Sequence, residues 1–202
     1  MSQQSMIMEV NRNLFLMAKW TRPGMGVYKC NTDGSSKDNL NISTTAFCVR
    51  NDRGELVVAQ ARKLDICTAL EAEVQAFKEG LTYCLNHHYI PLIMETDSLI
   101  IKKILDGIWE VPWNISGEIR ALKRDLKFID ATVVHTYREG NKLADFLSNV
   151  VANVAGPQLI QFNNFQELPI QTKTIMNMDK ASTPNFRTKK GQNNNTDTSH
   201  RD

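Results

Sequence analysis

The sequence of 202 residues predicts one α/β domain, a five-stranded mixed sheet with helices packed on it. Three observations lead to this fold class. Three β-rich runs joined by short turns come first, a long helical pattern follows, and helical and strand patterns then alternate. The resulting order is βββαβααβα. Tight turns join antiparallel neighbours and helices join parallel ones, so the sheet is expected to be mixed.

Turn residues separate the first three strands. The first strand ends at Gly34-Ser35-Ser36, and an Asp-x-Gly turn at 51–54 joins the second strand to the third. The fourth is a short, continuous apolar run, which is typical of a strand buried on both faces. The five predicted strands are 27–33, 44–50, 55–62, 89–96 and 131–137.

The helices follow from apolar residues at helical spacing. In the first helix, Leu70, Val74, Phe77 and Leu81 recur every three or four residues. The second helix stops at Asp106-Gly107. The four predicted helices are 69–85, 99–105, 115–129 and 142–151.

Composition divides the chain into three regions. Residues 1–19 are polar and Met-rich and predict a leader or linker, whereas residues 20–154 carry the periodicity and form the domain. Residues 155–202 are rich in Asn, Gln, Thr and Lys, which predicts a polar, largely disordered C-terminal tail. Residues 20–155 hold 16 Lys and Arg against 17 Asp and Glu, so a nucleic-acid partner must be held by local patches.

Several classes of protein are excluded. No apolar run approaches the roughly 18–20 residues of a membrane span, and the start of the chain lacks the pattern of a signal peptide. We therefore expect an intracellular protein without a membrane partner. Cys30, Cys48, Cys67 and Cys84 include no close pair, which favours buried reduced thiols over a zinc knuckle, a disulfide framework or a disulfide-linked partner.

Four acidic residues stand where a purely structural role is awkward. Asp33 and Asp97 each end a predicted strand, Glu73 lies near the edge of an apolar helix face, and Asp145 begins the last helix. Binding sites of open α/β sheets collect at the carboxyl ends of strands. Carboxylates gathered there repel one another, and the usual solution is a hard divalent cation such as Mg²⁺.

Each acid also has a structural alternative when taken alone. Asp33 suits a turn, and Asp97 with Ser98 suits the cap of the next helix. Glu73 suits a solvated helix position, and Asp145 suits the positive end of a helix dipole. The combination of all four favours the cation site.

Four blocks of the sequence resemble the plant ribonuclease H-like domains, which are related to type 1 ribonuclease H and to retroelement ribonuclease H modules. The resemblance covers about residues 20–153 and begins at Trp20, and the family's fold has the element order predicted above. The blocks are Lys-Cys-Asn-Thr-Asp-Gly-Ser at 29–35, Glu-Ala-Glu-Val-Gln-Ala at 71–76, Met-Glu-Thr-Asp-Ser-Leu at 94–99, and Arg-Glu-Gly-Asn at 138–141 with Ala-Asp at 144–145.

The resemblance implies an endoribonuclease that cleaves the RNA strand of RNA–DNA hybrids with two Mg²⁺ ions, for which Mn²⁺ can substitute. It implies that Asp33, Glu73, Asp97 and Asp145 are the catalytic, metal-binding acids. One ion would generate the attacking hydroxide and the other would stabilise the leaving 3′ oxygen, with Asp33 bridging ions about 3.5–4 Å apart. Glu73 would also hold the RNA 2′-hydroxyl, which distinguishes RNA from DNA.

Three further residues have open roles. Glu71 is the alternative to Glu73, although the Ala-Glu-Val context favours Glu73. His135 either assists product or proton traffic, as a histidine of type 1 enzymes does, or is a strand histidine hydrogen-bonded at the sheet edge. Asn31 either contacts the minor groove of the substrate or holds the end of its strand.

Basic residues suggest where a substrate would bind. One face of the predicted helix at 115–129 carries Arg120, Lys123, Arg124 and Lys127, called here the basic ridge. The ridge either contacts phosphates, which makes binding salt-dependent, or is a solvated helix face. Lys102-Lys103 would extend the patch. Trp109 and Trp113, between the two helices, either stack on a sugar or base or, as is favoured, pack beneath the helices.

One departure from the family's pattern concerns the second strand. Related domains have glycines at its start, where the backbone approaches the hybrid, but this chain has Asn-Ile-Ser-Thr-Thr-Ala-Phe at 41–47. The main alternative function is therefore a catalytically weak or inactive nucleic-acid-binding module of the same fold. A nuclease acting on DNA is a second alternative. The chain is expected to be a monomer or part of a larger retroelement polyprotein.

Overall fold

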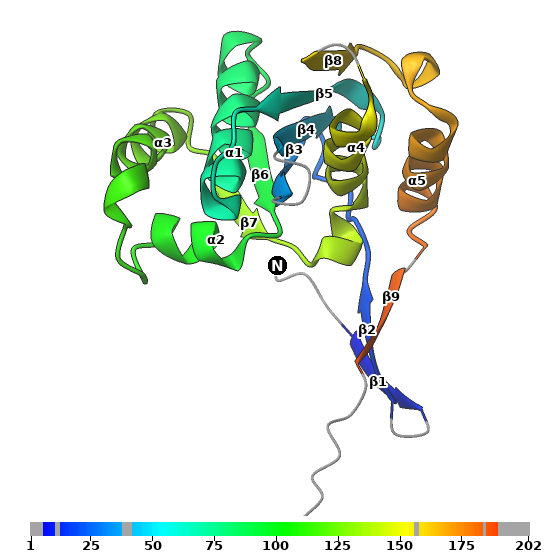
Figure 1. The fold of residues 1–202 in the computed structure, drawn as a ribbon. Helices are drawn as coiled ribbons and strands as arrows, with labels where there is room; N and C mark the ends of the chain where they lie inside the picture. Colours follow the sequence, from blue (N-terminus) through cyan, green and yellow to red (C-terminus); the bar gives the residue numbers. More distant parts are fainter. Residues whose placement is uncertain (1–5, 11–12, 38–41, 156–157, 184, 190–202) are drawn as a thin grey trace, which may run out of the picture.

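The main sheet has six strands in the order β7-β6-β3-β4-β5-β8 (Figure 1). The computed structural model describes residues 6–10, 13–37, 42–155, 158–183 and 185–189. The strands of the main sheet are β3 (Tyr28–Lys37), β4 (Ile42–Arg50), β5 (Leu56–Leu64), β6 (Leu92–Thr96), β7 (Thr132–His135) and β8 (Leu159–Phe162).

The directions of the strands confirm a mixed sheet. β3, β4 and β5 are antiparallel neighbours, while β6 runs parallel to β3 and β7 runs parallel to β6. The expected number of five strands is wrong, because β8 pairs antiparallel with β5. The added strand covers an edge of the sheet that would otherwise expose unpaired backbone groups.

Helices cover both faces of the sheet. On one face lie α1 (Ala69–Asn86), α2 (Leu99–Leu105), η2 (Trp113–Ile115) and α3 (Ser116–Phe128), and on the other α4 (Lys142–Asn153) and α5 (Ile170–Lys180) (Figure 1). Two short turns, η3 (Arg138–Gly140) and η4 (Phe165–Glu167), precede α4 and α5. Neighbouring residues of β4 enter different cores, since Phe47 packs in the core beneath α1 and Cys48 in the core beneath α4. The middle of the sheet is therefore buried on both sides.

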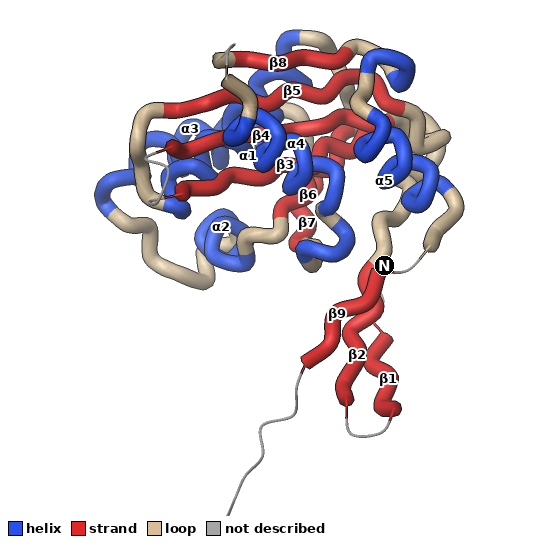
Figure 2. Tube along the Cα trace, turned by 45° about the vertical axis from the view of Figure 1, so that its right-hand side comes forward, coloured by secondary structure: helices blue, strands red, loops and turns tan. Residues whose placement is uncertain are grey.

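A second, three-stranded sheet extends away from the main body (Figure 2). It contains β1 (Met6–Val10), β2 (Asn13–Ala18) and β9 (Asn185–Lys189), and β2 pairs antiparallel with both neighbours. The pairing brings the N-terminal and C-terminal segments of the chain together.

These elements differ from the expected leader and disordered tail. The region from 158 to 189 holds β8, η4, α5 and β9. On α5, Thr172, Met176 and Asp179 are buried and lie at helical spacing, a stripe that the average composition of the region hides. The Asn-rich run at 192–199, on which the prediction of disorder mainly rested, lies outside the described residues.

Two smaller expectations concern thiols and membranes. All four cysteines are free, and only Cys67 is not fully buried. Across the described part of the chain, every helix is too short or too polar to pass through a bilayer.

Candidate active site

Strand register places two of the predicted acids side by side. In the parallel pair β3–β6, Thr32 lies opposite Thr96, and the next residues are Asp33 and Asp97. β6 ends at Thr96, but the expected end of the first strand at Gly34-Ser35-Ser36 is wrong, because β3 continues to Lys37 in its pairing with β4. Ser98, rather than Asp97, caps α2 by accepting a hydrogen bond from the backbone N–H of Ile101 at 3.4 Å. The Asp97 carboxylate is therefore not used as the helix cap.

The third acid reaches the same point because α1 crosses β3 at close range. A Cβ atom added to Gly34 would lie 2.2 Å from the backbone carbonyl carbon of Ala72, so only glycine permits this approach. The Gly34 N–H donates to Oε2 of Glu73 at 3.3 Å. The crossing of α1 over β3 thus places the Glu73 carboxylate beside Gly34, the residue that follows Asp33.

Asp33, Glu73 and Asp97, called here the carboxylate trio, form a cluster of oxygen donors. Each offers a carboxylate oxygen, and these oxygens lie within 4.8 Å of one another. Carboxylate oxygens at the end of a strand are the donors that Mg²⁺ prefers.

Burial and mutual repulsion disfavour the charged forms of the trio's carboxyl groups. Burial, aided by the charges of Asp97 and Asp145, raises the pKa of Asp33 to about 7. Burial and the charges of Asp33 and Asp97 raise the pKa of Glu73 to about 9. Burial also raises the pKa of Asp97, although the Asn141 amide opposes this shift. A bound divalent cation would remove the repulsion, so these residues fit the metal that the family implies.

The fourth predicted acid does not join the trio. Asp145, in the first turn of α4, accepts a hydrogen bond from Nε of Arg138 at 2.9 Å and forms an ion pair with that guanidinium. Arg138 also partly offsets the repulsion among the acids, because its charge lowers the pKa of Asp33 and of Glu73. Asp145 remains close enough for its own charge to raise the pKa of Asp33.

Asn141 is a site residue to which the sequence analysis assigned no role. Its Nδ2 donates to the Thr32 carbonyl at 2.9 Å and to Oδ1 of Asp97 at 3.0 Å. Both donors of one amide therefore connect the start of α4 to the middle of β3 and to the residue after β6. Its place in the Arg-Glu-Gly-Asn block, directly before the helix that carries Asp145, was the signal available in the sequence.

Asn31 lies inside the protein. Its side chain is fully buried, and its Nδ2 donates to Oε2 of Glu95 at 2.7 Å and to Oδ1 of Asn141 at 3.2 Å. Asn31 lies inside β3, and its amide connects this strand to β6 and to the start of α4. A contact with the minor groove stays a prediction and would require this buried side chain to become exposed.

His135 ends β7 beside the trio. Its Nε2 donates to the backbone carbonyl of Asp97 at 3.2 Å, and its ring meets that of Tyr137 edge-on. This geometry is that of a strand histidine bound at the sheet edge. A role in product or proton traffic stays a prediction.

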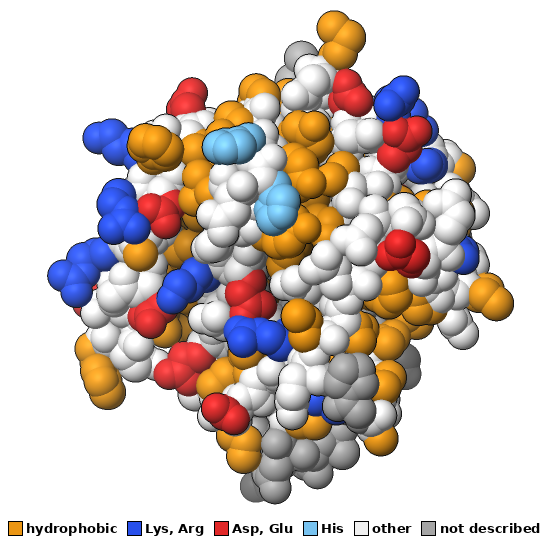
Figure 3. Space-filling view, turned by 90° about the horizontal axis from the view of Figure 1, so that it is seen from above, with side chains coloured by type: hydrophobic (Ala, Val, Ile, Leu, Met, Phe, Trp, Pro, Cys, Tyr) orange, Lys and Arg blue, Asp and Glu red, His pale blue; other side chains and the backbone are white. Residues whose placement is uncertain are grey.

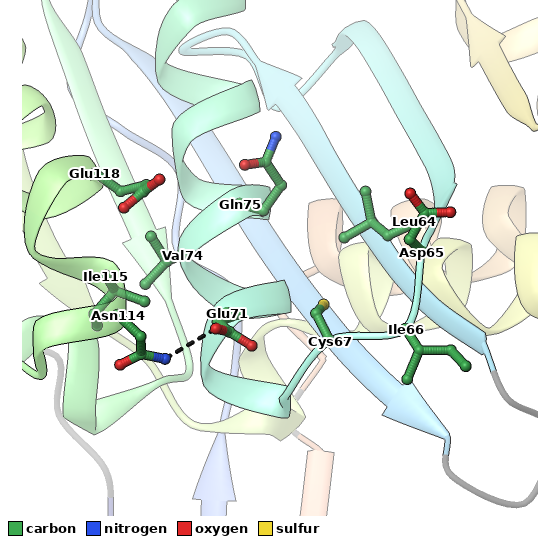
Figure 4. Close-up of a pocket in the computed structure, with 10 residues that line it drawn as sticks. All are labelled: Leu64, Asp65, Ile66, Cys67, Glu71, Val74, Gln75, Asn114, Ile115 and Glu118. Carbon is green, nitrogen blue, oxygen red and sulfur yellow. Dashed lines mark hydrogen bonds between the residues drawn. The ribbon is translucent and has the colours of Figure 1, made fainter.

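Glu71 has a structural task that separates it from Glu73. The carboxylate of Glu71 accepts from the backbone N–H of Thr68 at 2.9 Å, and the Thr68 hydroxyl accepts from the Glu71 N–H at 3.2 Å, which is a capping box at the start of α1. Nδ2 of Asn114 donates to the other carboxylate oxygen at 2.9 Å (Figure 4).

We expect Glu73→Gln to affect Mg²⁺ binding and Glu71→Gln to affect stability. Glu73→Gln removes a carboxylate ligand from the trio, so it should weaken Mg²⁺ binding strongly and leave the melting temperature unchanged or raised. Glu71→Gln should leave Mg²⁺ binding unchanged and lower the melting temperature slightly through the weakened cap. Calorimetric Mg²⁺ titration and thermal unfolding of both variants test this. A loss of Mg²⁺ binding in Glu71→Gln alone would reverse the assignment.

A cavity of about 320 Å³ lies between the start of α1, the β5–α1 loop and the η2–α3 segment (Figure 4). Its lining includes the carboxylates of Asp65, Glu71 and Glu118. These charges make it unsuitable for a phosphate, and its lining includes no member of the trio.

The bulky start of β4 is accommodated inside the protein. The side chains of Ser43, Thr44 and Thr45 are fully buried. The Ser43 hydroxyl donates to the Cys67 carbonyl, and the Thr45 hydroxyl donates to the Glu79 carboxylate at 2.7 Å. These three residues therefore use their side chains within the fold, while residue 41 lies outside the described part.

The basic ridge is exposed along α3. All four of its side chains are accessible, and Figure 3 shows Lys and Arg side chains along the edge of the molecule where α3 lies. Arg124 pairs with Asp125 at 2.9 Å, and Lys102 on α2 is ion-paired with Asp106. Trp113 is 90% exposed and Trp109 is 44% exposed with Lys103 over its ring, so the expected packing of these tryptophans beneath the helices is wrong.

Comparison with known proteins assigns the chain to a family. The profile of the family described as reverse transcriptase-like matches residues 31–151, which include the trio, Asn141 and Asp145. This chain is a ribonuclease H-like domain of that family. A protein of Arabidopsis thaliana named as a candidate ribonuclease H protein is 26% identical over 167 residues, covering 81% of this chain. The ribonuclease H-like chain spans only 26% of the length of that relative.

Solved structures share the fold of the ribonuclease H-like domain. A ribonuclease H1 isolated from compost has a TM-score of 0.59 at 19% identity, covering 64% of this chain and 97% of that one. The same ribonuclease H1 in complex with an RNA/DNA hybrid has a TM-score of 0.56 at 18% identity, covering 61% and 94%. Ribonuclease H1 of Halobacterium salinarum has a TM-score of 0.55 at 20% identity, covering 63% and 98%. At these identities the likeness shows the fold alone.

Proposed function

We propose that this domain is an endoribonuclease that cleaves the RNA strand of RNA–DNA hybrids with Mg²⁺, for which Mn²⁺ can substitute. The observation that carries the proposal is the convergence of Asp33, Glu73 and Asp97 within 4.8 Å, at the point where the parallel pairing of β3 with β6 ends. The family supports the substrate class, and one solved relative of this fold is in complex with an RNA/DNA hybrid.

Each residue of the proposed site has a defined task. The trio would hold the metal, which when bound supplies positive charge to the scissile phosphate and lowers the pKa of water. Asn141 orients the Asp97 carboxylate through its hydrogen bond. Glu73 would accept a hydrogen bond from the 2′-hydroxyl of the RNA. The basic ridge and Trp113 would contact the nucleic-acid backbone. Asp145 would complete the donor set for a second ion once it is released from Arg138.

A second candidate is a nucleic-acid-binding module with weak or no catalysis. The specific observation in its favour is the ion pair between Arg138 and Asp145, which engages one of the four predicted metal ligands. In this candidate the basic ridge would bind the hybrid without turnover.

The test is cleavage of a hybrid labelled on its RNA strand, with Mg²⁺ or EDTA, by the wild type and by Asp97→Asn. We expect cleavage by the wild type with Mg²⁺ and no cleavage by Asp97→Asn. A salt-dependent gel shift of the hybrid without cleavage would support the binding module. Cleavage that persists in EDTA would contradict the proposed function.

A further inference from the structure

A chain of buried polar contacts runs from α5 to the carboxylate trio. α5 lies beyond residues 31–151, which match the family, yet its Asp179 is buried against the sheet. Five side chains make up this chain of contacts, called here the relay: Asp179, Arg50, Asn31, Asn141 and Asp97.

The first contact is an ion pair inside the protein. Nη1 of Arg50 donates to Oδ2 of Asp179 at 2.6 Å, and the two side chains are 1% and 4% exposed. The guanidinium also lies over the Trp20 ring, 3.7 Å from its centroid. A buried guanidinium needs a counter-charge, so Asp179 determines where Arg50 is held.

The second contact fixes the orientation of an amide. Oδ1 of Asn31 accepts from Nη2 of Arg50 at 2.8 Å and from Nε1 of Trp20 at 3.0 Å. A flipped amide would point its NH₂ group at these two donors, which is unfavourable. Nδ2 of Asn31 must therefore face the opposite way, where it donates to Glu95 and to Oδ1 of Asn141.

The third contact passes this orientation to Asn141. Because Oδ1 of Asn141 accepts from Asn31, its Nδ2 must turn toward the Thr32 carbonyl and Oδ1 of Asp97. Each amide in the relay uses both N–H groups and has one orientation that satisfies its neighbours. A change at Arg50 removes one of the two donors that hold the Asn31 amide in this orientation, and through Asn141 it loosens the donor that holds Asp97.

We propose that Asp179 is a positioning residue for the carboxylate trio. By holding Arg50 it sets the orientation of Asn31 and Asn141, and so the direction of the Asp97 carboxylate. The C-terminal helix is in this sense part of the metal site, although it contributes no ligand. The inference rests on the proposed function, since it treats Asp97 as a metal ligand.

The test compares Asp179→Asn with Met176→Ala. Asn removes the counter-charge of Arg50 at nearly constant volume. Met176 is a fully buried residue of the same helix, and its packing is apolar, so Met176→Ala weakens the docking of α5 without cutting the relay. The readouts are the side-chain ¹⁵N–¹H resonances of Asn31 and Asn141 and the calorimetric affinity for Mg²⁺, at a temperature where all proteins are folded.

We expect Asp179→Asn to shift the Asn141 amide resonances and to weaken Mg²⁺ binding about 10-fold, the effect typical of losing a group that orients a ligand. Met176→Ala should lower the melting temperature while leaving the amide resonances and the Mg²⁺ affinity as in the wild type. If Asp179→Asn does not fold, the double variant Arg50→Met with Asp179→Leu removes both charges and keeps an apolar interior. It should show the same shift and the same loss.

Unchanged Asn141 resonances in Asp179→Asn, or equal changes in Met176→Ala, would overturn the inference. The resonances are read without metal or substrate. A wild type that neither binds Mg²⁺ nor cleaves the hybrid would therefore refute the proposed function. The Asn141 amide resonances would still show whether Asp179 controls the orientation of that amide.

Discussion

Asp33→Asn is expected to abolish cleavage and, in the absence of metal, to stabilise the protein at pH 8. Burial and neighbouring charge raise the pKa of Asp33 from 3.8 to about 7. Between these values the folded state binds a proton that the unfolded state has released, so the free energy of unfolding falls as pH rises toward 7. A neutral Asn avoids this loss. The gain at pH 8 should be on the order of 2–4 kcal/mol.

Thermal unfolding in EDTA at pH 5 and pH 8 measures this effect. The melting temperature of Asp33→Asn should exceed that of the wild type clearly at pH 8 and by much less at pH 5. Added Mg²⁺ should stabilise the wild type and not the variant. Asp125→Asn, on the exposed side of α3, is the control and should show no pH-dependent gain. A lower melting temperature of Asp33→Asn at pH 8 would mean that this carboxylate is structural.

Gly34→Ala is expected to be the most destabilising Gly→Ala substitution among the glycines that the structure describes. The added Cβ would lie 2.2 Å from the Ala72 carbonyl carbon and 2.3 Å from the Glu73 amide nitrogen, both of them backbone atoms of α1. The helix must then move away from β3, at a cost of about 3 kcal/mol or more. Because Glu73 is carried by the same turn, Mg²⁺ binding should be lost as well.

Urea unfolding of Gly34→Ala and Gly117→Ala makes the comparison. Gly117 lies within α3, and an added Cβ there has no neighbour within 4 Å. Gly117→Ala should be neutral or should stabilise the protein by up to about 1 kcal/mol, because Ala favours a helix. If Gly34→Ala unfolded at the same urea concentration as the wild type, α1 would not be held against β3 as described.

The acids of the trio were predictable because their signals are local. Asp33 and Asp97 follow runs that read as strands, and the two runs become parallel neighbours in register. Glu73 stands next to buried residues of an amphipathic helix. By contrast, the partner of Asp145 could not be predicted from periodicity, since Arg138 comes from the short turn before α4 and only the fold brings the guanidinium to the carboxylate.

The C-terminal elements were missed for a different physical reason. The composition averaged over residues 155–202 is that of a polar chain. Four residues nevertheless suffice for β8 to pair with β5, and only three residues of α5 form its buried stripe. Asp179 at the end of that stripe was the available signal. An acid in line with buried Thr172 and Met176 indicates a partner of opposite charge, although nothing in the sequence identifies that partner as Arg50.

The separation of Arg50 and Asp179 has a consequence for biosynthesis. The two residues are 129 positions apart, so on the order of 10 s of translation passes between them. During that interval the nascent sheet contains a guanidinium whose counter-charge has not been made. Docking of α5 is then a late event of maturation, followed among the described elements by the pairing of β9 with β2.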